Sequence, residues 1–289
     1  MSPAPSAGPP LMQRFSDKVV LVTGAARGQG RSHAVRLASE GADVLAVDIV
    51  RDIDSVAYDL ATPADLAGTA ELVRGHGRRV VTAEVDVRDA DALAAAVRDG
   101  AAELGGIDVV LANAGIGIMR DDVPDATAFR DQLDVNLTGV WNTVQAAAPL
   151  MIEQGRGGAV VLTSSAFGLT GRGGDGRGGT DGYVASKHGV VGLMRTFATW
   201  LGPHGIRVNC VNPSGVATRM VLNPAVEALF GGGDEPAADP KPTDDVANLF
   251  DVALVEVQDV TAAVAFLASD EARYVTGVAL PVDAGMLVR

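Results

Sequence analysis

The chain has 289 residues, of which 47% are hydrophobic, 20% are charged and only 4% are aromatic. This composition is too apolar for an intrinsically disordered protein, and the length suffices for one large domain with its own core. Acidic residues outnumber basic ones by 36 to 23, and the formal net charge of -13 argues against nucleic acid as a partner. The only cysteine, Cys210, excludes an intramolecular disulfide and a cysteine-rich metal site.

The apolar runs and the start of the chain bear on where the protein works. No run approaches the roughly 18 apolar residues of a membrane-spanning helix, and the first residues lack the order of a secretory signal. We expect a soluble, cytoplasmic protein with no membrane partner. The four histidines are scattered without metal-ligand spacing, so no metal site is predicted.

Residues 1–15 contain four prolines and little that a core would bury, which predicts a disordered N-terminal tail. Over residues 16–289 short β-branched runs alternate with stretches of helical length, and nothing resembles an interdomain linker. This alternation is typical of βαβ units, so we expect a single α/β domain with a parallel sheet. In chain order the predicted elements are a strand at Lys18–Thr23, a helix at Gly30–Glu40, a strand at Asp43–Asp48, a helix at Pro63–Gly75, a strand at Arg79–Val85, a helix at Ala90–Leu104, a strand at Asp108–Ala112, a helix at Thr127–Ile152, a strand at Gly158–Thr163, a helix at Tyr183–Leu201, a strand at Arg207–Val211, a helix at Asp259–Ala268 and a strand at Ala279–Val282.

Two connections are longer than this alternation requires. The first is Ile49–Thr62, between the second strand and the second helix. The second is Gly168–Gly182, which holds eight glycines in fifteen residues. Loops of this length in a compact domain are usually functional or mobile.

A glycine-rich turn separates the first predicted strand from the first predicted helix, with glycines at Gly24, Gly28 and Gly30. Glycines in this place let the backbone approach a pyrophosphate, and the helix N-terminus offers free N–H groups and the positive end of the helix dipole. The turn therefore predicts a dinucleotide-binding site.

The end of the second strand indicates which dinucleotide binds. Asp48 follows Gly30 by 18 residues, where a carboxylate accepts hydrogen bonds from the adenosine ribose hydroxyls and repels a 2′-phosphate. NAD is therefore favoured over NADP. Arg27 is the counterargument, because a basic residue in the turn can pair with that phosphate.

More candidate contacts follow the third and fourth strands, at the edge where open α/β sheets bind ligands. Asp86, followed by Val87, is predicted to accept a hydrogen bond from the adenine amino group. The sequence Asn113, Ala114, Gly115 is predicted to line the adenine ribose.

Four polar side chains form a candidate catalytic group. Tyr183 and Lys187 are four residues apart, which places them on one helical face, and a nearby ammonium lowers the pKa of a phenol. Ser165 follows the fifth strand and is predicted to hold a substrate oxygen opposite Tyr183. Asn136, in the helix after the fourth strand, is predicted to support a water chain to Lys187.

Taken together, these motifs resemble the short-chain dehydrogenase/reductase family over essentially all of residues 16–289. The resemblance implies a Rossmann-type, doubly wound parallel sheet of about seven strands with helices on both faces, hydride transfer to or from a nicotinamide, and a homotetramer. One departure is the spacing of 18 from Ser165 to Tyr183, which makes the glycine-rich loop longer than the family's. The matching motifs are Thr23-Gly24-x3-Gly28-x-Gly30, Asn113-Ala114-Gly115, Asn136, Ser165, Tyr183-x3-Lys187 and Pro213…Thr218.

The resemblance also implies residue roles. Tyr183 is the implied acid/base, Lys187 lowers its pKa and binds the nicotinamide ribose, Ser165 orients the carbonyl or hydroxyl, and Asn136 anchors the relay water. Together with the turn and strand-end residues above, the expected cofactor contacts are Gly24, Arg27, Gly28, Gln29, Gly30, Asp48, Ile49, Asp86, Val87, Asn113, Ala114, Gly115, Tyr183, Lys187, Pro213, Gly215, Val216 and Thr218.

A narrower resemblance rests on Asn136–Trp141, Lys187–Thr196 and Ala268–Gly277, together with the extension after Asp48. These segments look like the actinobacterial subfamily that includes carveol dehydrogenases and is described as mycofactocin-coupled. In that subfamily the extension folds over the NAD, which stays bound, and electrons leave to an external redox carrier. The resemblance implies that residues 49–62 are a cofactor-side insertion that clamps NAD, and that mycofactocin is the carrier.

Residues 219–256 lie where the family has its mobile substrate lid. We expect an NAD-dependent oxidoreductase that interconverts a small hydrophobic, carveol-like secondary alcohol and its ketone. Two alternatives stay open: an NADP-dependent ketoacyl-type reductase, which Asp48 disfavours, and a non-enzymatic dinucleotide sensor, which would be free to lose the catalytic residues. Apolar walls for the substrate are expected from Trp141, Phe167, Met220, Leu222 and Phe230.

Overall fold

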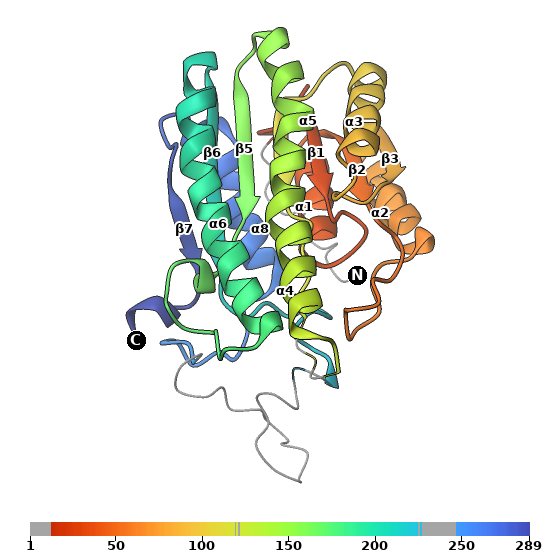
Figure 1. Ribbon diagram of the computed structural model, residues 1–289. Helices are drawn as coiled ribbons and strands as arrows, with labels where there is room; N and C mark the ends of the chain where they lie inside the picture. The colour runs from red at the N-terminus through yellow and green to blue at the C-terminus, as the bar shows by residue number, and fades with distance from the viewer. Residues whose placement is uncertain (1–12, 119, 121, 225, 227–246) are drawn as a thin grey trace, which may run out of the picture.

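The computed structural model describes residues 13–118, 120, 122–224, 226 and 247–289. Seven strands form one sheet in the order β3-β2-β1-β4-β5-β6-β7, and every neighbouring pair is parallel (Figure 1). The predicted parallel α/β sheet is confirmed. The strands are β1 (Val19–Thr23), β2 (Asp43–Asp48), β3 (Val80–Glu84), β4 (Val109–Ala112), β5 (Gly158–Thr163), β6 (Ile206–Pro213) and β7 (Ala279–Val282).

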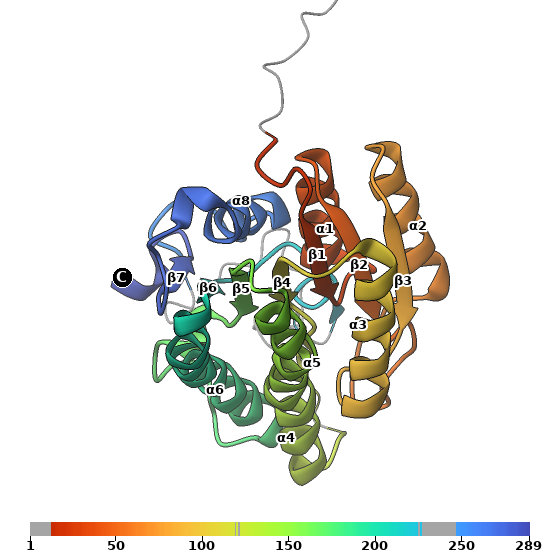
Figure 2. The ribbon, with the colours of Figure 1, turned by 90° about the horizontal axis from the view of Figure 1, so that it is seen from above.

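Helices cover both faces of this sheet. Those on one face are α1 (Gly28–Ser39), α2 (Pro63–Gly75) and α8 (Val257–Ala268), and those on the other are α3 (Ala90–Leu104), α4 (Asp125–Leu133), α5 (Gly139–Gln154) and α6 (Gly178–Leu201) (Figure 2). The chain is thus doubly wound, and the carboxyl ends of the strands meet at one edge of the sheet.

The core has two layers, one on each side of the sheet, and β1 shows how a single strand serves both. Successive side chains of a strand point to opposite faces. Val19 and Leu21 pack into the cluster beneath α3, α5 and α6, whereas Val20 and Val22 pack into the cluster beneath α1 and α8. A strand that is covered on both faces must be apolar at every position, which is why the strands could be located as continuous apolar runs.

Two predicted boundaries are wrong, and close packing explains both. The single helix predicted at Thr127–Ile152 is α4, a π-helical turn at Asp134–Thr138 and α5. The glycine-rich loop predicted to reach Gly182 ends earlier, because α6 begins at Gly178. A Cβ atom at Gly178 would lie 2.0 Å from the backbone oxygen of Asp125, so the glycine lets α6 approach α4.

The predicted tail is also too long at its inner end, since the fold begins before Phe15. The Phe15 side chain is buried, and the Arg14 guanidinium donates to the Glu40 carboxylate from Nε at 2.5 Å and from Nη2 at 2.8 Å. Residues 1–12 lie outside the described residues, as do residues 225 and 227–246 of the predicted lid.

The Glu40 carboxylate is a buried charge that depends on its two arginine partners. Its side chain is 1% exposed, and Arg36 donates to it at 2.6 Å in addition to Arg14. Burial by itself raises the pKa of Glu40, but the hydrogen bonds from Arg14 and Arg36 outweigh burial and hold the pKa below its usual range. This group therefore stabilises the fold above the unfolded-state pKa, and the contribution is lost as the pH falls.

We expect Arg14→Met to lower the free energy of unfolding by about 2 kcal/mol at pH 7, because it leaves a buried carboxylate short of a partner. Urea denaturation at pH 7 and pH 3.5 measures this, and the loss should shrink at the lower pH as Glu40 becomes protonated. The control is Arg98→Met, whose pair with Asp99 has both side chains exposed. An equal loss for both variants would contradict the assignment.

Candidate active site

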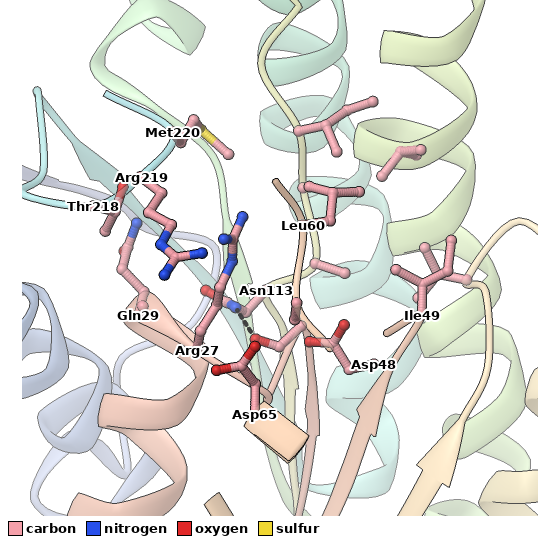
Figure 3. Close-up of a pocket in the computed structure, with 18 of the residues that line it drawn as sticks. Arg27, Gln29, Asp48, Ile49, Leu60, Asp65, Asn113, Thr218, Arg219 and Met220 are labelled. Carbon is pink, nitrogen blue, oxygen red and sulfur yellow. Dashed lines mark hydrogen bonds between the residues drawn. The ribbon is translucent and has the colours of Figure 1, made fainter. Parts of the chain in front are cut away.

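A pocket of about 380 Å³ opens at the carboxyl edge of the sheet (Figure 3). Its walls come from the glycine turn after β1, the ends of β2, β3 and β4, residues 49–62 and the segment that follows β6. The sequence-predicted cofactor residues that line it are Gly24, Arg27, Gly28, Gln29, Asp48, Ile49, Asp86, Val87, Asn113, Ala114, Gly115 and Thr218.

The glycine turn has the form that a dinucleotide cradle requires. Gly24 and Gly28 adopt left-handed conformations, with φ of +68° and +54°, that other residues rarely adopt. A Cβ atom at Gly30 would lie 2.0 Å from the Gly24 oxygen, so Gly30 permits the turn to fold back on α1 without itself lining the pocket. The side-chain oxygen of Gln29 is buried without a hydrogen-bond partner beside the N-terminus of α1. The turn thus fits the pyrophosphate of a dinucleotide.

The Asp48 carboxylate lies beside this turn and fixes it. It accepts hydrogen bonds from the backbone N–H of Ala26 at 2.9 Å and of Val50 at 3.2 Å, and it lines the pocket. A carboxylate offers about four lone pairs, so acceptor capacity is left for ribose hydroxyls. The position therefore suits the predicted role in selecting NAD.

Asp86 and Asn113 make internal contacts that sequence reasoning did not foresee. Asp86 is paired with Arg88 at 2.7 Å and with Arg51 at 3.3 Å, and its pKa is lowered because the bonds from Arg88 outweigh the effect of burial. The Asn113 amide donates to the backbone oxygen of Thr23 at 3.1 Å. Each side chain therefore braces the pocket wall, in addition to any contact with a ligand.

The four predicted catalytic residues do converge. Ser165, which is 6% exposed, bonds to the hydroxyl of Tyr183, and the Lys187 Nζ lies 5.6 Å from the centroid of the Tyr183 ring. A Cβ atom placed on Gly115 would lie 3.5 Å from the Lys187 Nζ and 3.2 Å from the Asn136 Oδ1. The group thus lies directly behind the pocket wall at Gly115.

Burial dominates the electrostatics of this group. It raises the pKa of Tyr183, and the bond from Ser165 offsets only part of that effect. It also lowers the pKa of Lys187 to about 8, while the Lys187 Nζ donates to the Thr163 backbone oxygen at 3.0 Å. Burial is the larger effect on Tyr183, and the predicted lowering of its pKa by Lys187 stays a prediction.

Asn136 has a different set of contacts from the predicted one. It lies in the π-helical turn, where its Oδ1 accepts from the Ile116 N–H at 2.8 Å and its Nδ2 donates to the Ile116 oxygen at 2.9 Å. Nδ2 also donates to the Gln132 Oε1 at 2.8 Å. The side chain therefore fastens the segment after β4, and its part in a water relay stays a prediction.

The residues predicted after β6 divide into two groups. Thr218 reaches the pocket, whereas Pro213, Gly215 and Val216 do not line it. The Pro213 oxygen accepts from the Ser165 hydroxyl at 3.5 Å, and Val216 pairs with Val255. These three residues shape the turn that delivers Thr218.

Residues 49–62 cover the pocket, and Tyr58 is the contact that sequence reasoning missed. The Tyr58 ring lies 5.7 Å from the Arg27 guanidinium carbon, and its hydroxyl accepts from the Gly117 N–H at 3.1 Å. Arg27 also donates to the Asp59 backbone oxygen at 2.6 Å. Tyr58 is the only aromatic residue in Ile49–Thr62, and this feature of the sequence could have pointed to its contact. The segment ends at a capping box between Thr62 and Asp65 that starts α2.

The residues predicted as substrate walls lie in different places, with Phe167 half-buried after β5, and their role stays a prediction. Met220 lines the pocket, but Trp141 is 44% exposed on α5, beside Leu137 and Leu193, and is not part of the site. Leu222 is 55% exposed, and Phe230 lies outside the described residues. Within the part of the chain that the structure describes, no three His, Cys, Asp or Glu side chains gather as metal ligands, and no helix is long and apolar enough to cross a membrane.

Lys187 is 4% exposed, so its charge destabilises the fold. We expect Lys187→Met to raise the free energy of unfolding by about 2 kcal/mol at pH 7, after allowing for the lost bond to Thr163. Between about pH 8 and 10 the unfolded wild type binds more protons than the folded one, since the folded pKa is about 8 against 10.5. Wild-type stability therefore rises over this range relative to the variant.

Urea denaturation at pH 7, 8.5 and 10 tests this expectation. The control is Lys18→Met, at a half-buried position where no comparable gain is expected. A gap between wild type and Lys187→Met that stays constant with pH would contradict the role of the buried charge.

Known proteins with a similar sequence or structure belong to the family that these motifs resemble. The sequence model of the short-chain dehydrogenase family matches residues 18–225. A (-)-trans-carveol dehydrogenase of Rhodococcus erythropolis is 44% identical, with 96% of this chain and 100% of that one covered.

Two solved structures are similar over nearly the whole chain. A carveol dehydrogenase from Mycobacterium avium in complex with NAD has 49% identity and a TM-score of 0.85, with 96% of this chain and 99% of that one covered. A short chain dehydrogenase from Mycobacterium paratuberculosis bound to NAD has 43% identity and a TM-score of 0.86, with 96% and 100% covered. The chain belongs to the short-chain dehydrogenase family.

Proposed function

We propose that the protein is an NAD-dependent oxidoreductase that interconverts a small hydrophobic secondary alcohol of the carveol type and its ketone. The observation that carries this proposal is the convergence of Ser165, Tyr183 and Lys187 behind the Gly115 wall of the pocket. The similarity to a carveol dehydrogenase and to NAD-bound relatives supports both the substrate class and the cofactor.

The residues present fit NAD along the whole length of the pocket. The glycine turn and the N-terminus of α1 would hold the diphosphate, Asp48 the adenosine ribose, and the wall at Gly115 the nicotinamide half. When bound, the nicotinamide accepts or donates the hydride. Asp48 also disfavours the 2′-phosphate of NADP.

The chain's own residues would manage the proton. Ser165 and Tyr183 both bind the substrate oxygen. The Tyr183 hydroxyl donates the proton to that oxygen in reduction and accepts it in oxidation. The Lys187 ammonium, held by the Thr163 oxygen, stabilises the phenolate when Tyr183 ionises.

The alternatives receive less support from the same site. A ketoacyl-type reductase using NADP would have to place a phosphate beside the Asp48 carboxylate, which already lines the pocket. A dinucleotide sensor would have no need of a proton-transferring group such as Ser165 and Tyr183. Retention of such a group favours catalysis.

We expect Tyr183→Phe to reduce turnover of a carveol-type alcohol at least about 10³-fold while NAD binding stays within twofold, because only the proton-transferring hydroxyl is removed. Steady-state kinetics and calorimetric titration with NAD give the two readouts. Tyr274→Phe, at a 91% exposed position, is the control. Unaltered turnover in Tyr183→Phe would overturn the mechanism.

We further propose that residues 49–62 clamp the cofactor, so that NAD stays bound and electrons leave to an external carrier such as mycofactocin. The contacts of Tyr58 with Arg27 and Gly117 close this segment over the pocket, and the Ser55 hydroxyl donates to the Asp131 carboxylate of α4 at 2.5 Å.

We also propose that the protein is a cytoplasmic homotetramer. The exposed Trp141 on α5 supports a subunit interface on that helix.

We expect Tyr58→Ala to release NAD about tenfold faster, because it removes the ring beneath Arg27 and the acceptor of the Gly117 N–H. Asp59→Ala is a matched control in the same segment, since Arg27 binds the Asp59 backbone oxygen and not its side chain. The nucleotide that remains after repeated dilution is released by denaturation and quantified by mass spectrometry. Wild-type protein that loses NAD as quickly as the variant would count against the clamp.

A further inference from the structure

Arg219 is a charged residue at the pocket that sequence reasoning did not select. It lines the pocket, directly after Thr218, and its charge acts on the Asp65 carboxylate, although no hydrogen bond or ion pair joins its guanidinium to another of the residues that the structure describes. Figure 3 shows the side chains of Arg219 and Arg27 extending into the same opening, one from each side. Two guanidinium groups in one pocket are notable in a chain whose net charge is -13.

A compact turn holds Arg219 in this place. The N–H groups of Val221 and Leu222 both donate to the Thr218 oxygen, at 2.9 Å and 2.7 Å. The buried Asn223 side chain donates to the backbone oxygens of Arg219 at 3.0 Å and Met220 at 2.9 Å. The backbone at Arg219 is therefore fixed by the fold.

The neighbouring cations show which donors are still available to a ligand. Arg31 is committed to the backbone oxygen of Ala26, to that of Asp65 at 2.8 Å and to the Thr69 hydroxyl at 2.9 Å. Arg27 uses one nitrogen for the Asp59 oxygen. Among the residues that the structure describes, no hydrogen bond takes up the remaining donors of Arg27 or any donor of Arg219, so these donors are available to an anion.

These donors surround the place where the glycine turn would hold a diphosphate. A Cβ atom at Gly28, the first residue of α1, would lie 3.6 Å from the Thr218 methyl group, so the turn that carries Arg219 sits over the helix N-terminus. The first turn of α1 has no acidic residue to occupy its N–H groups. The helix N-terminus and the two guanidinium groups therefore face one region of the pocket, which the Asp48 and Asp65 carboxylates also line.

We propose that Arg219 binds the cofactor's diphosphate together with Arg27, so that this one anion ties the segment after β6 to the insertion at residues 49–62. The inference rests on the proposed function, because it takes NAD as the ligand. Arg27 contributes through its contacts with Tyr58 and Asp59, and Arg219 through the turn at Thr218. Binding of the diphosphate thereby links two covers of the pocket that belong to distant parts of the chain.

Repulsion between the positive charges of Arg27 and Arg219 explains why their close approach depends on a bound anion. Burial lowers the pKa of Arg27 and the Arg219 charge adds to that effect, whereas the Asp48 and Asp65 carboxylates act against it. The two guanidinium groups therefore repel one another, and these carboxylates offset only part of the effect. A diphosphate neutralises both. Removal of Arg219 should therefore weaken nucleotide binding without destabilising the protein that holds no nucleotide.

The test compares three ligands that share an adenosine. Full-length protein, freed of nucleotide with charcoal, is titrated calorimetrically with NAD, ADP and adenosine at 0.05 M and 0.5 M KCl. For Arg219→Met we expect NAD and ADP to bind about tenfold more weakly at low salt, with a smaller loss at high salt and adenosine unchanged. Arg219→Lys should recover part of the loss, and Arg98→Met on the exposed face of α3 is the control.

The outcomes separate this inference from the proposed function. Equal losses for adenosine and ADP, a lowered unfolding temperature of the nucleotide-free variant, or unchanged affinity for all three ligands would each overturn the role of Arg219 while leaving NAD as the cofactor. Wild-type protein that binds ADP and adenosine but not NAD would overturn the proposed function and the inference with it. Selective loss of the diphosphate-containing ligands supports it.

Discussion

The whole site depends on one constraint, which is that the strands of a parallel sheet end at the same edge with their last polar groups unpaired. In this protein, the polar groups that the sheet itself leaves unpaired form hydrogen bonds with the loops that follow neighbouring strands. The Thr23 hydroxyl at the end of β1 accepts from the N–H groups of Asn113 and Ala114 after β4, at 3.1 Å and 3.2 Å, and Asp48 at the end of β2 accepts from Ala26 in the glycine turn. These bonds hold the backbone open at the point where a dinucleotide would lie, and they leave the N-terminus of α1 facing the pocket.

A second constraint is that the chemical group lies in the protein interior. Lys187 and Asn136 are almost fully buried, and both make hydrogen bonds to backbone atoms at the ends of neighbouring elements. Burial lowers the pKa of Lys187, which costs stability at neutral pH, and it raises the pKa of Tyr183. The π-helical turn at Asp134–Thr138 belongs to the same arrangement, because it places Asn136 against the segment after β4.

The segments that cover the pocket are held in place by different contacts from those that hold its floor. The floor consists of strand ends and a glycine turn that the sheet fixes, whereas the covers are residues 49–62 and the turn after β6, which attach through a few polar and aromatic contacts. Tyr58 attaches the first cover to Arg27 and Gly117. The pocket therefore has a base that the sheet holds in place and covers that a few side chains attach to it, and a charged ligand can strengthen such attachments.

The sequence by itself determined the parallel α/β sheet, the glycine turn, and the grouping of Ser165, Tyr183 and Lys187. It could do so because strands buried on both faces must be continuously apolar, and because strand ends and helix periodicity place nearby residues on known edges and faces. Only the tertiary structure decided that Trp141 faces away from the site, that α6 begins at Gly178, and that Tyr58 and Arg219 face the pocket. Those features depend on contacts between segments far apart in the chain, such as α6 against Asp125 of α4, or Arg27 against Tyr58, and no local pattern of residues records which segments will meet.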